Sequence, residues 1–180
     1  MNPLIEGFKL IGDSLVKESS IWWFLAPVFI LWIVTEIYFG EYKKERLGWN
    51  SVLANGISFS WINIASLRVL FLESSGPDDI ALRTVILGLF FLYGIFVIFM
   101  AFTHKIPQKL GSWLAGPTTI YLLSTISVLW GQGVLEINRW VLTDFIILYF
   151  IIHLIFWLIK KKLGVLGEVE AISKCEEPLQ

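Results

Sequence analysis

The sequence has few of the residues from which catalytic and metal sites are built. Only 16% of its 180 residues are charged, and it contains two histidines and one cysteine. Because Cys175 is the only thiol, an intrachain disulfide and a multi-cysteine metal site are excluded. The sequence also lacks a glycine-rich phosphate loop, a histidine pair at metal-binding spacing and a nucleophile elbow. We therefore expect no enzymatic activity, no cofactor, no bound metal and no nucleic-acid partner.

Apolar residues, by contrast, are in excess. They make up 56% of the chain, whereas a soluble domain has about 45–50%. A chain of this length exposes much of its surface, so a single core cannot hide the excess. Nine tryptophans and five tyrosines favour the headgroup region of a bilayer. The composition therefore predicts an integral membrane protein whose main partner is the lipid bilayer.

Several apolar segments are long enough to be membrane-spanning helices, which need about 20 residues each. The five predicted spans are residues 21–39, 52–72, 80–102, 110–130 and 137–159. The second span is the least apolar, and the fourth contains Gly116-Pro117, which predicts a kink. Because the connections are short, consecutive helices should be antiparallel neighbours. The predicted fold is an all-α integral membrane protein with a compact bundle of five transmembrane helices.

The segment before the bundle has an amphipathic pattern, and the segment after it is polar. In residues 1–20, apolar side chains share one helical face, namely Leu4, Phe8, Ile11 and Leu15. The opposite face carries Glu6, Lys9, Asp13 and Lys17. This pattern predicts an interfacial helix on the membrane surface, or alternatively a short helix packed on the end of the bundle. The transmembrane domain then covers 21–162, and 163–180 form a cytosolic tail.

Lysine and arginine residues are concentrated on one side of the predicted bundle. That side carries Lys43, Lys44, Arg46, Lys105, Lys109, Lys160, Lys161 and Lys162, and the other carries Lys9, Lys17, Arg83 and Arg139. Basic residues accumulate on the cytoplasmic side of membrane proteins. The chain is therefore predicted to be a multi-pass protein of the cell membrane with its N-terminus outside and its C-terminus in the cytoplasm.

Two predicted spans carry stripes of polar side chains. The stripe of the second span contains Asn55, Ser58, Asn63 and Ser66, and that of the fourth contains Thr118, Tyr121 and Thr125. Polar groups in hydrocarbon need hydrogen-bond partners, so both stripes should face inward or toward another subunit. They either join the helices by hydrogen bonds or line a hydrated pathway. In the second case, Pro117 would free backbone carbonyls for an ion or a polar solute.

Four ionisable residues lie within the predicted spans, and such residues are functional candidates. They are Glu36, Arg68, Asp144 and His153. Arg68 could reach the headgroups or form a buried ion pair. Asp144 and His153 are about half a turn out of phase on one helix, so they should not share a pocket.

Each acidic candidate has a structural and a functional interpretation. For Asp144 we favour an ion pair with Arg68 or Arg83 over a carboxylate that serves transport. For Glu36 we favour neutralisation by Lys43 or Lys44 over a proton site, and the depth of His153 would allow a contact with Glu36.

Three functions remain open at this level. The first is a channel or transporter subunit for an ion or small polar solute, acting as a homo-oligomer because five helices enclose little space. The second is a non-catalytic assembly, scaffold or accessory subunit that binds a partner in a membrane complex. The third is a lipid-modifying enzyme that uses His104 or Glu36. The polar residues of the second span favour transport.

Overall fold

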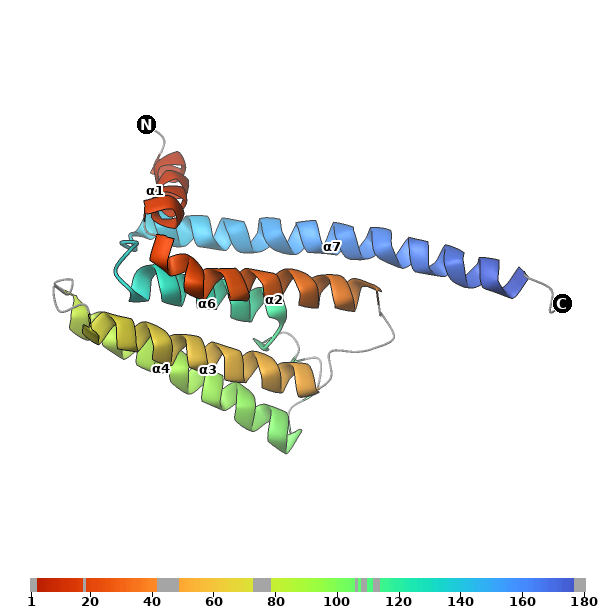
Figure 1. Cartoon of the computed structure of the whole chain (residues 1–180), viewed down its shortest axis with the longest axis horizontal. Helices are drawn as coiled ribbons and strands as arrows, with labels where there is room; N and C mark the ends of the chain where they lie inside the picture. The colour runs from red at the N-terminus through yellow and green to blue at the C-terminus, as the bar shows by residue number, and fades with distance from the viewer. Residues whose placement is uncertain are drawn as a thin grey trace.

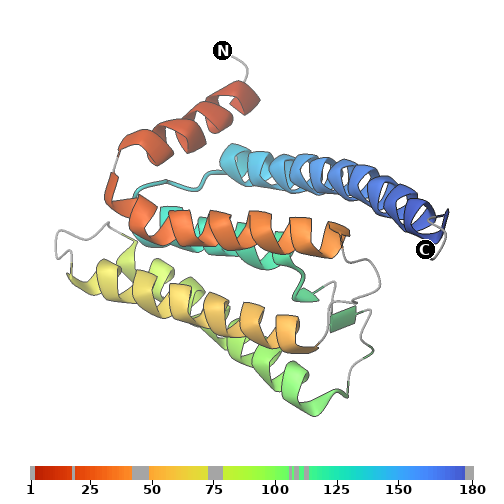
Figure 2. The ribbon, with the colours of Figure 1, turned by 45° about the vertical axis from the view of Figure 1, so that its right-hand side comes forward.

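The computed structural model describes residues 3–17, 19–41, 49–72, 79–105, 107, 110–111 and 114–176, and this part of the chain contains helices and turns but no strand. Its labelled elements are α1 (Pro3–Lys17), η1 (Ser19–Ile21), α2 (Trp22–Glu41), α3 (Trp49–Leu72), α4 (Ile80–Thr103), α6 (Pro117–Gly131) and α7 (Arg139–Glu176). Helices α2, α3, α4, α6 and α7 run side by side, whereas α1 crosses the end of the bundle (Figures 1 and 2). The predicted all-helical class is confirmed for the described residues.

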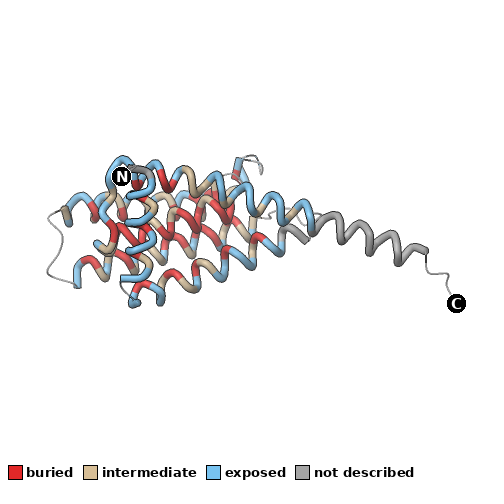
Figure 3. Tube along the Cα trace, turned by 90° about the horizontal axis from the view of Figure 1, so that it is seen from above, coloured by how far each residue is buried: buried red, intermediate tan, exposed pale blue. Residues whose placement is uncertain are grey.

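Among the described residues, three helices are long and apolar enough to cross a membrane, namely those over Ser19–Tyr38, Ile80–Thr103 and Arg139–Lys162. Only 28%, 28% and 11% of their most apolar windows are buried inside the protein. Figure 3 shows the exposed positions on the outer sides of the helices and the buried ones where the helices meet. Apolar helices that leave most of their surface uncovered favour a membrane location.

The predicted fourth span is interrupted, which corrects the expectation of one kinked helix over 110–130. Helix α6 begins only at Pro117, after Gly116 in an extended conformation with φ −62° and ψ 150°. Proline has no N–H to donate to the preceding turn and fits the first position of a helix, so the break falls directly before it. At 15 residues, α6 is too short to be a candidate span by itself.

The start of α7 is also set by local chemistry. Asn138 precedes the helix, and its side-chain Oδ1 accepts hydrogen bonds from the backbone N–H groups of Trp140 and Val141, each at 2.9 Å. This is an N-cap, which satisfies two donors that the helix itself leaves free. The helix then continues to Glu176 and so includes most of the segment 163–180 that the sequence assigns to a tail.

Helix α6 is the centre of the core. Its buried residues are Pro117, Thr118, Ile120, Tyr121, Leu122, Ser124, Thr125, Ser127, Val128, Leu129, Trp130 and Gly131. It contacts α2, α3, α4 and α7, and the surrounding core takes side chains such as Leu25, Phe59 and Phe145. A helix buried on nearly all sides needs no apolar stripe of its own.

Helices α3 and α4 approach closely at two glycines. A Cβ atom on Gly94 would lie 2.3 Å from Ser60 Oγ and 3.1 Å from the Ser60 backbone nitrogen. A Cβ atom on Gly56 would lie 2.9 Å from Cγ1 of Val97. Small residues at such crossings let helix backbones pack in direct contact.

Candidate functional site

A buried carboxylate on α2 is the centre of the candidate site. Glu36 is 3% exposed, and its Oε1 accepts a hydrogen bond of 2.6 Å from the hydroxyl of Thr118 on α6. Its Oε2 forms an ion pair with Nζ of Lys160 on α7. Lys43 and Lys44, the expected partners, lie outside the described residues; among those described, Lys160 pairs with Glu36.

The break before α6 brings a helix N-terminus to this carboxylate. Thr118 is the second residue of α6, next to Pro117. The first N–H groups of a helix have no partner within it and carry partial positive charge. The negative charge of Glu36 is therefore compensated from two sides, by Lys160 and by the start of α6.

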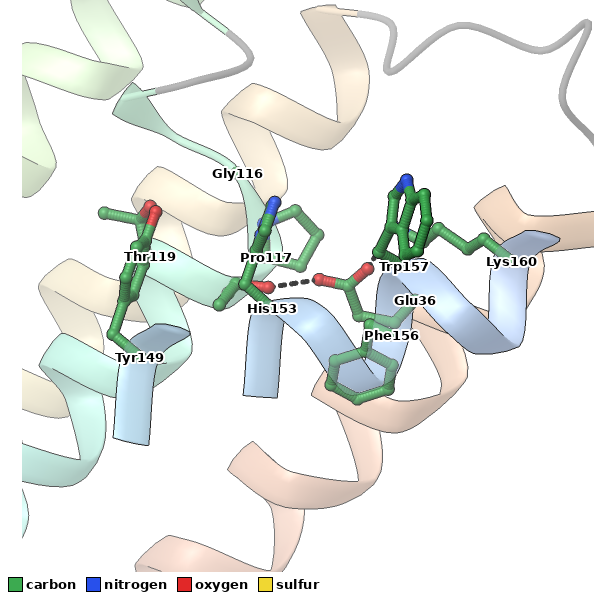
Figure 4. A pocket seen from close by; sticks show the side chains of 10 residues that line it. Glu36, Gly116, Pro117, Thr119, Tyr149, His153, Phe156, Trp157 and Lys160 are labelled. Atoms are coloured by element: carbon green, nitrogen blue, oxygen red, sulfur yellow. Dashed lines mark hydrogen bonds and ion pairs between the residues drawn. The ribbon is translucent and has the colours of Figure 1, made fainter. Parts of the chain in front are cut away.

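Beside this ion pair lies a pocket of about 240 Å³. One wall consists of Glu36 and residues 116–119. The other wall is a single face of α7, because its members recur at about one helical turn: Tyr149, His153, Phe156, Trp157 and Lys160. Figure 4 shows Glu36 facing this part of α7. The pocket thus combines a carboxylate, an ammonium group, an imidazole, hydroxyls and aromatic rings.

The imidazole of His153 lies at the exposed edge of the pocket. Its ring stacks on the ring of Tyr149 at a centroid distance of 6.2 Å and an interplanar angle of 15°. The depth match that the sequence suggested between His153 and Glu36 thus corresponds to one shared pocket. Asp144 does not line this pocket.

The polar stripes of α3 and α6 meet at the same break in the chain. Asn55, which is 3% exposed, donates a hydrogen bond of 2.7 Å from Nδ2 to the carbonyl of Ala115. Its Oδ1 accepts a bond of 3.2 Å from the hydroxyl of Tyr121. The hydroxyl of Tyr93 donates to the carbonyl of Leu114 at 2.9 Å. The carbonyls near the break are therefore bound by the protein's own side chains.

The remaining stripe residues bond within their own helices or lack a partner. Thr125 donates to the carbonyl of Tyr121 at 2.9 Å. Asn63 donates to the carbonyl of Phe59 at 2.8 Å, but its Oδ1 and the hydroxyl of Ser66 have no hydrogen-bond partner among the described residues. Both residues are 0% exposed, while Ser58 is half-buried. Most of this face is thus closed by packing.

The expected ion pair of Asp144 with Arg68 or Arg83 is not formed. Arg83 donates to Asp79 Oδ1 at 2.7 Å and to the carbonyl of Trp130, over whose ring it also lies. Arg68 is exposed. Asp144 is 0% exposed, and neither carboxyl oxygen has a partner among the described residues. A nearby arginine is more easily bound by the residue one turn before it than by another helix.

Three pocket residues on α7 were not predicted as part of a site, although their spacing in the sequence indicated a shared helical face. Tyr149 precedes His153 at helical spacing, and Trp157 and Lys160 follow it, so the sequence alone places them on one face of α7. What remained hidden was the partner of that face. Lys160 was assigned only to the basic cluster at the end of the span.

The described chain is thus an all-helical protein with three candidate membrane-spanning helices and a buried ion pair beside a pocket. No protein-family model, curated protein or solved structure matches it.

Proposed function

We propose that this chain is a small membrane transport protein, a channel or transporter subunit, whose pocket around Glu36 binds an ion or a small polar solute. The Glu36–Lys160 ion pair carries the proposal, because it sets two charges beside a pocket between apolar helices. Ionisable groups in such surroundings are costly and often belong to ion or substrate pathways. The break before α6 gives further support, since interrupted helices present their ends to bound ions in many transporters.

Within this proposal, Lys160 is an internal cation that competes with an incoming cation for Glu36. A carboxylate that is 3% exposed needs a positive partner or a proton. The side chain of Lys160 is 34% exposed. When a proton or a small cation occupies Glu36, Lys160 is free to extend toward the headgroups. Glu36 would then carry the cation, and Lys160 would set how tightly it is held.

We further propose five crossings of the cell membrane, with the N-terminus outside and the C-terminus in the cytoplasm. The 24 residues of α3 extend about 36 Å, and the hydrocarbon core is about 30 Å thick. Helix α6 is shorter, so the preceding chain would complete its crossing while covered by neighbouring helices. Labelling of Cys175 by an impermeant thiol reagent tests the orientation. Reaction in intact cells, before permeabilisation, would contradict it.

The transport proposal is tested by ion flux in proteoliposomes. Proton flux would be followed with a pH dye trapped in the vesicles, and sodium and potassium flux with tracers. Glu36→Gln keeps the size of the side chain and one acceptor oxygen but removes its charge. We expect it to reduce flux strongly, because it removes the charge that would hold the ion in the pocket.

Lys161→Met is the matched control for Lys160→Met. Lys161 is the next residue on α7 and lies over the Trp157 ring, at 5.5 Å from its centroid, instead of pairing with Glu36. We expect Lys160→Met to alter flux and Lys161→Met to leave it near the wild-type value. Unchanged flux in the Glu36→Gln variant would refute transport through this site.

The packing of α3 against α6 favours a second candidate function, a non-catalytic subunit of a membrane complex. The bonds of Asn55 to Tyr121 and to the Ala115 carbonyl use the polar side chains to hold helices together. If the chain is such a subunit, a specific partner protein should co-purify with it in mild detergent. Isolation of the chain alone, with flux that depends on Glu36, would exclude it.

A further inference from the structure

Asp144, on the opposite half of the described part of α7 from the Glu36 pocket, is a buried acid without a partner. It is 0% exposed, and both of its carboxyl oxygens lack a hydrogen-bond partner among the described residues. An isolated ionised carboxylate in apolar surroundings is so costly that such a group takes up a proton instead. Unlike Glu36, Asp144 forms no ion pair with any residue in the part of the chain that the structure describes.

Helix α1 covers this carboxyl group directly. A Cβ atom on Gly7 would lie 1.9 Å from Asp144 Oδ2 and 3.4 Å from the backbone carbonyl carbon of Trp140. A side chain at position 7 would therefore have to displace the Asp144 carboxyl group for α1 to pack against α7 as it does here. The same face of α1 buries Ile11 and Ser14, so the contact with Asp144 belongs to the docking surface of the whole helix.

The described charged and titratable groups of the elements around Asp144 are either exposed to solvent or in contact with other residues. The described members of this set are Glu6, Lys9, Asp13 and Lys17 on α1, Glu36 and Tyr38 on α2, Tyr121 on α6, Glu136 before α7, and Arg139, Tyr149, His153 and Lys160–Lys162 on α7. Tyr38 is exposed. The exposed groups are the four charged residues of α1 and Glu136, Arg139, His153, Lys161 and Lys162. The ring of Tyr149 stacks on that of His153. Glu36 pairs with Lys160, and Tyr121 bonds to Asn55. None of these described groups is paired with Asp144.

We propose that Asp144 is a proton-binding site closed by α1, and that loss of its proton releases α1 from α7. With the proton bound, the carboxyl group is neutral and can remain against Gly7. Without it, the negative charge must gain water, and moving α1 away is the most direct way to supply it. A cavity of about 490 Å³ lies between α1 and residues 133–138, and its lining includes Ser14 of the docked face of α1.

The proposal does not depend on transport through the Glu36 pocket, because it concerns the position of α1. It is tested by thiol labelling of full-length protein in lipid nanodiscs, with Cys175→Ser as the background. Ser14→Cys reports on the docked face, since Ser14 is 4% exposed. Gly12→Cys is the matched control on the same helix, because Gly12 is exposed and a Cβ atom there meets nothing within 4 Å.

The measured quantity is the maleimide labelling rate at position 14 divided by that at position 12, which cancels the titration of the thiol itself. We expect the ratio to rise about fivefold or more between about pH 5 and about pH 9. Asp144→Asn is neutral at every pH and should keep the ratio at its low value throughout. Gly7→Ala should raise the ratio even at low pH, whereas Gly12→Ala, in the background with only the position-14 cysteine, should leave that labelling rate unchanged.

Two results would overturn the proposal. One is a ratio that does not change with pH when Asp144 is present. The other is a rise of the same size in the Asp144→Asn variant, which would assign the titration to another group. If Asp144→Asn does not yield folded protein, a low ratio in Gly7→Ala at low pH would equally overturn it, because α1 would then dock without this contact.

Discussion

Replacing Lys160 with methionine removes the positive charge that pairs with the buried Glu36 carboxylate while keeping most of the aliphatic length of the side chain. Glu36 would remain 3% exposed and would keep the Thr118 hydroxyl and the start of α6 as its only described stabilising contacts. A carboxylate left in that position is destabilised by the loss of its counter-charge.

The size of the effect follows from the burial of the two partners. Breaking a fully buried ion pair by removing one partner costs about 3–5 kcal/mol. Lys160 is 34% exposed, so solvent already screens part of the attraction. We therefore expect Lys160→Met to lower the free energy of unfolding by about 1–3 kcal/mol. In the double variant with Glu36→Gln no charge is left unpaired, so the loss should be smaller than the sum of the single losses by about 1–2 kcal/mol.

Thermal unfolding in detergent, followed by circular dichroism, measures this double-mutant cycle. For a chain of this size, 1 kcal/mol corresponds to a shift in Tm of about 2–4 °C. Lys161→Met is again the control and should leave Tm near the wild-type value. A Lys160→Met variant as stable as wild type, or a cycle with no coupling between positions 36 and 160, would refute the described geometry of the site.

Three further substitutions test the packing, each by Tm in detergent. Gly94→Ala places a Cβ atom against the Ser60 backbone and should lower the free energy of unfolding by about 1–3 kcal/mol. Gly88→Ala is the control, because a Cβ atom there meets nothing within 4 Å. It should leave the free energy of unfolding unchanged or raise it by up to about 1 kcal/mol. Equal effects of the two would contradict the close approach of α3 and α4. Asn55→Leu leaves a buried carbonyl and a buried hydroxyl without their partner and should cost about 1–3 kcal/mol. Thr118→Val removes a hydrogen bond to a charged group and should cost about 1.5–3 kcal/mol; an unchanged Tm would argue against that bond.

Some features of the site followed from local pattern. Pro117 predicted a disturbance of the helix, because a missing N–H acts within one turn of the chain. The amphipathic pattern of α1 predicted one apolar face, of which Ile11 is buried while Phe8 and Leu15 are half-buried. Gly7 and Ser14, which the pattern did not include, are also buried. The extent of the break was not predictable in this way. It ends the helix outright because Asn55 and Tyr93 from other helices bind the carbonyls that lie before it.

The sequence did not allow us to predict which charged residues pair with one another. The position of a residue along its helix can be counted from the sequence, and Glu36 and His153, which were predicted at similar depth, line one pocket. The rotation of one helix relative to its neighbour cannot be obtained in this way. Arg83 was a reasonable partner for Asp144 by depth, yet it bonds to Asp79, the residue directly before its own helix α4. Tertiary packing instead covers Asp144 with Gly7, a contact that involves no charge and leaves no trace in charge spacing.

The amino-acid sequence by itself determined that the chain is helical, that its helices are apolar on the outside, and that few charges lie among them. These are consequences of composition and of the period of the helix, which act along the chain. The tertiary structure decided which polar groups meet: Glu36 with Lys160 and Thr118, Asn55 with Tyr121, and Asp144 with Gly7. Such meetings depend on the rotation and offset of neighbouring helices, which are set by packing across the bundle.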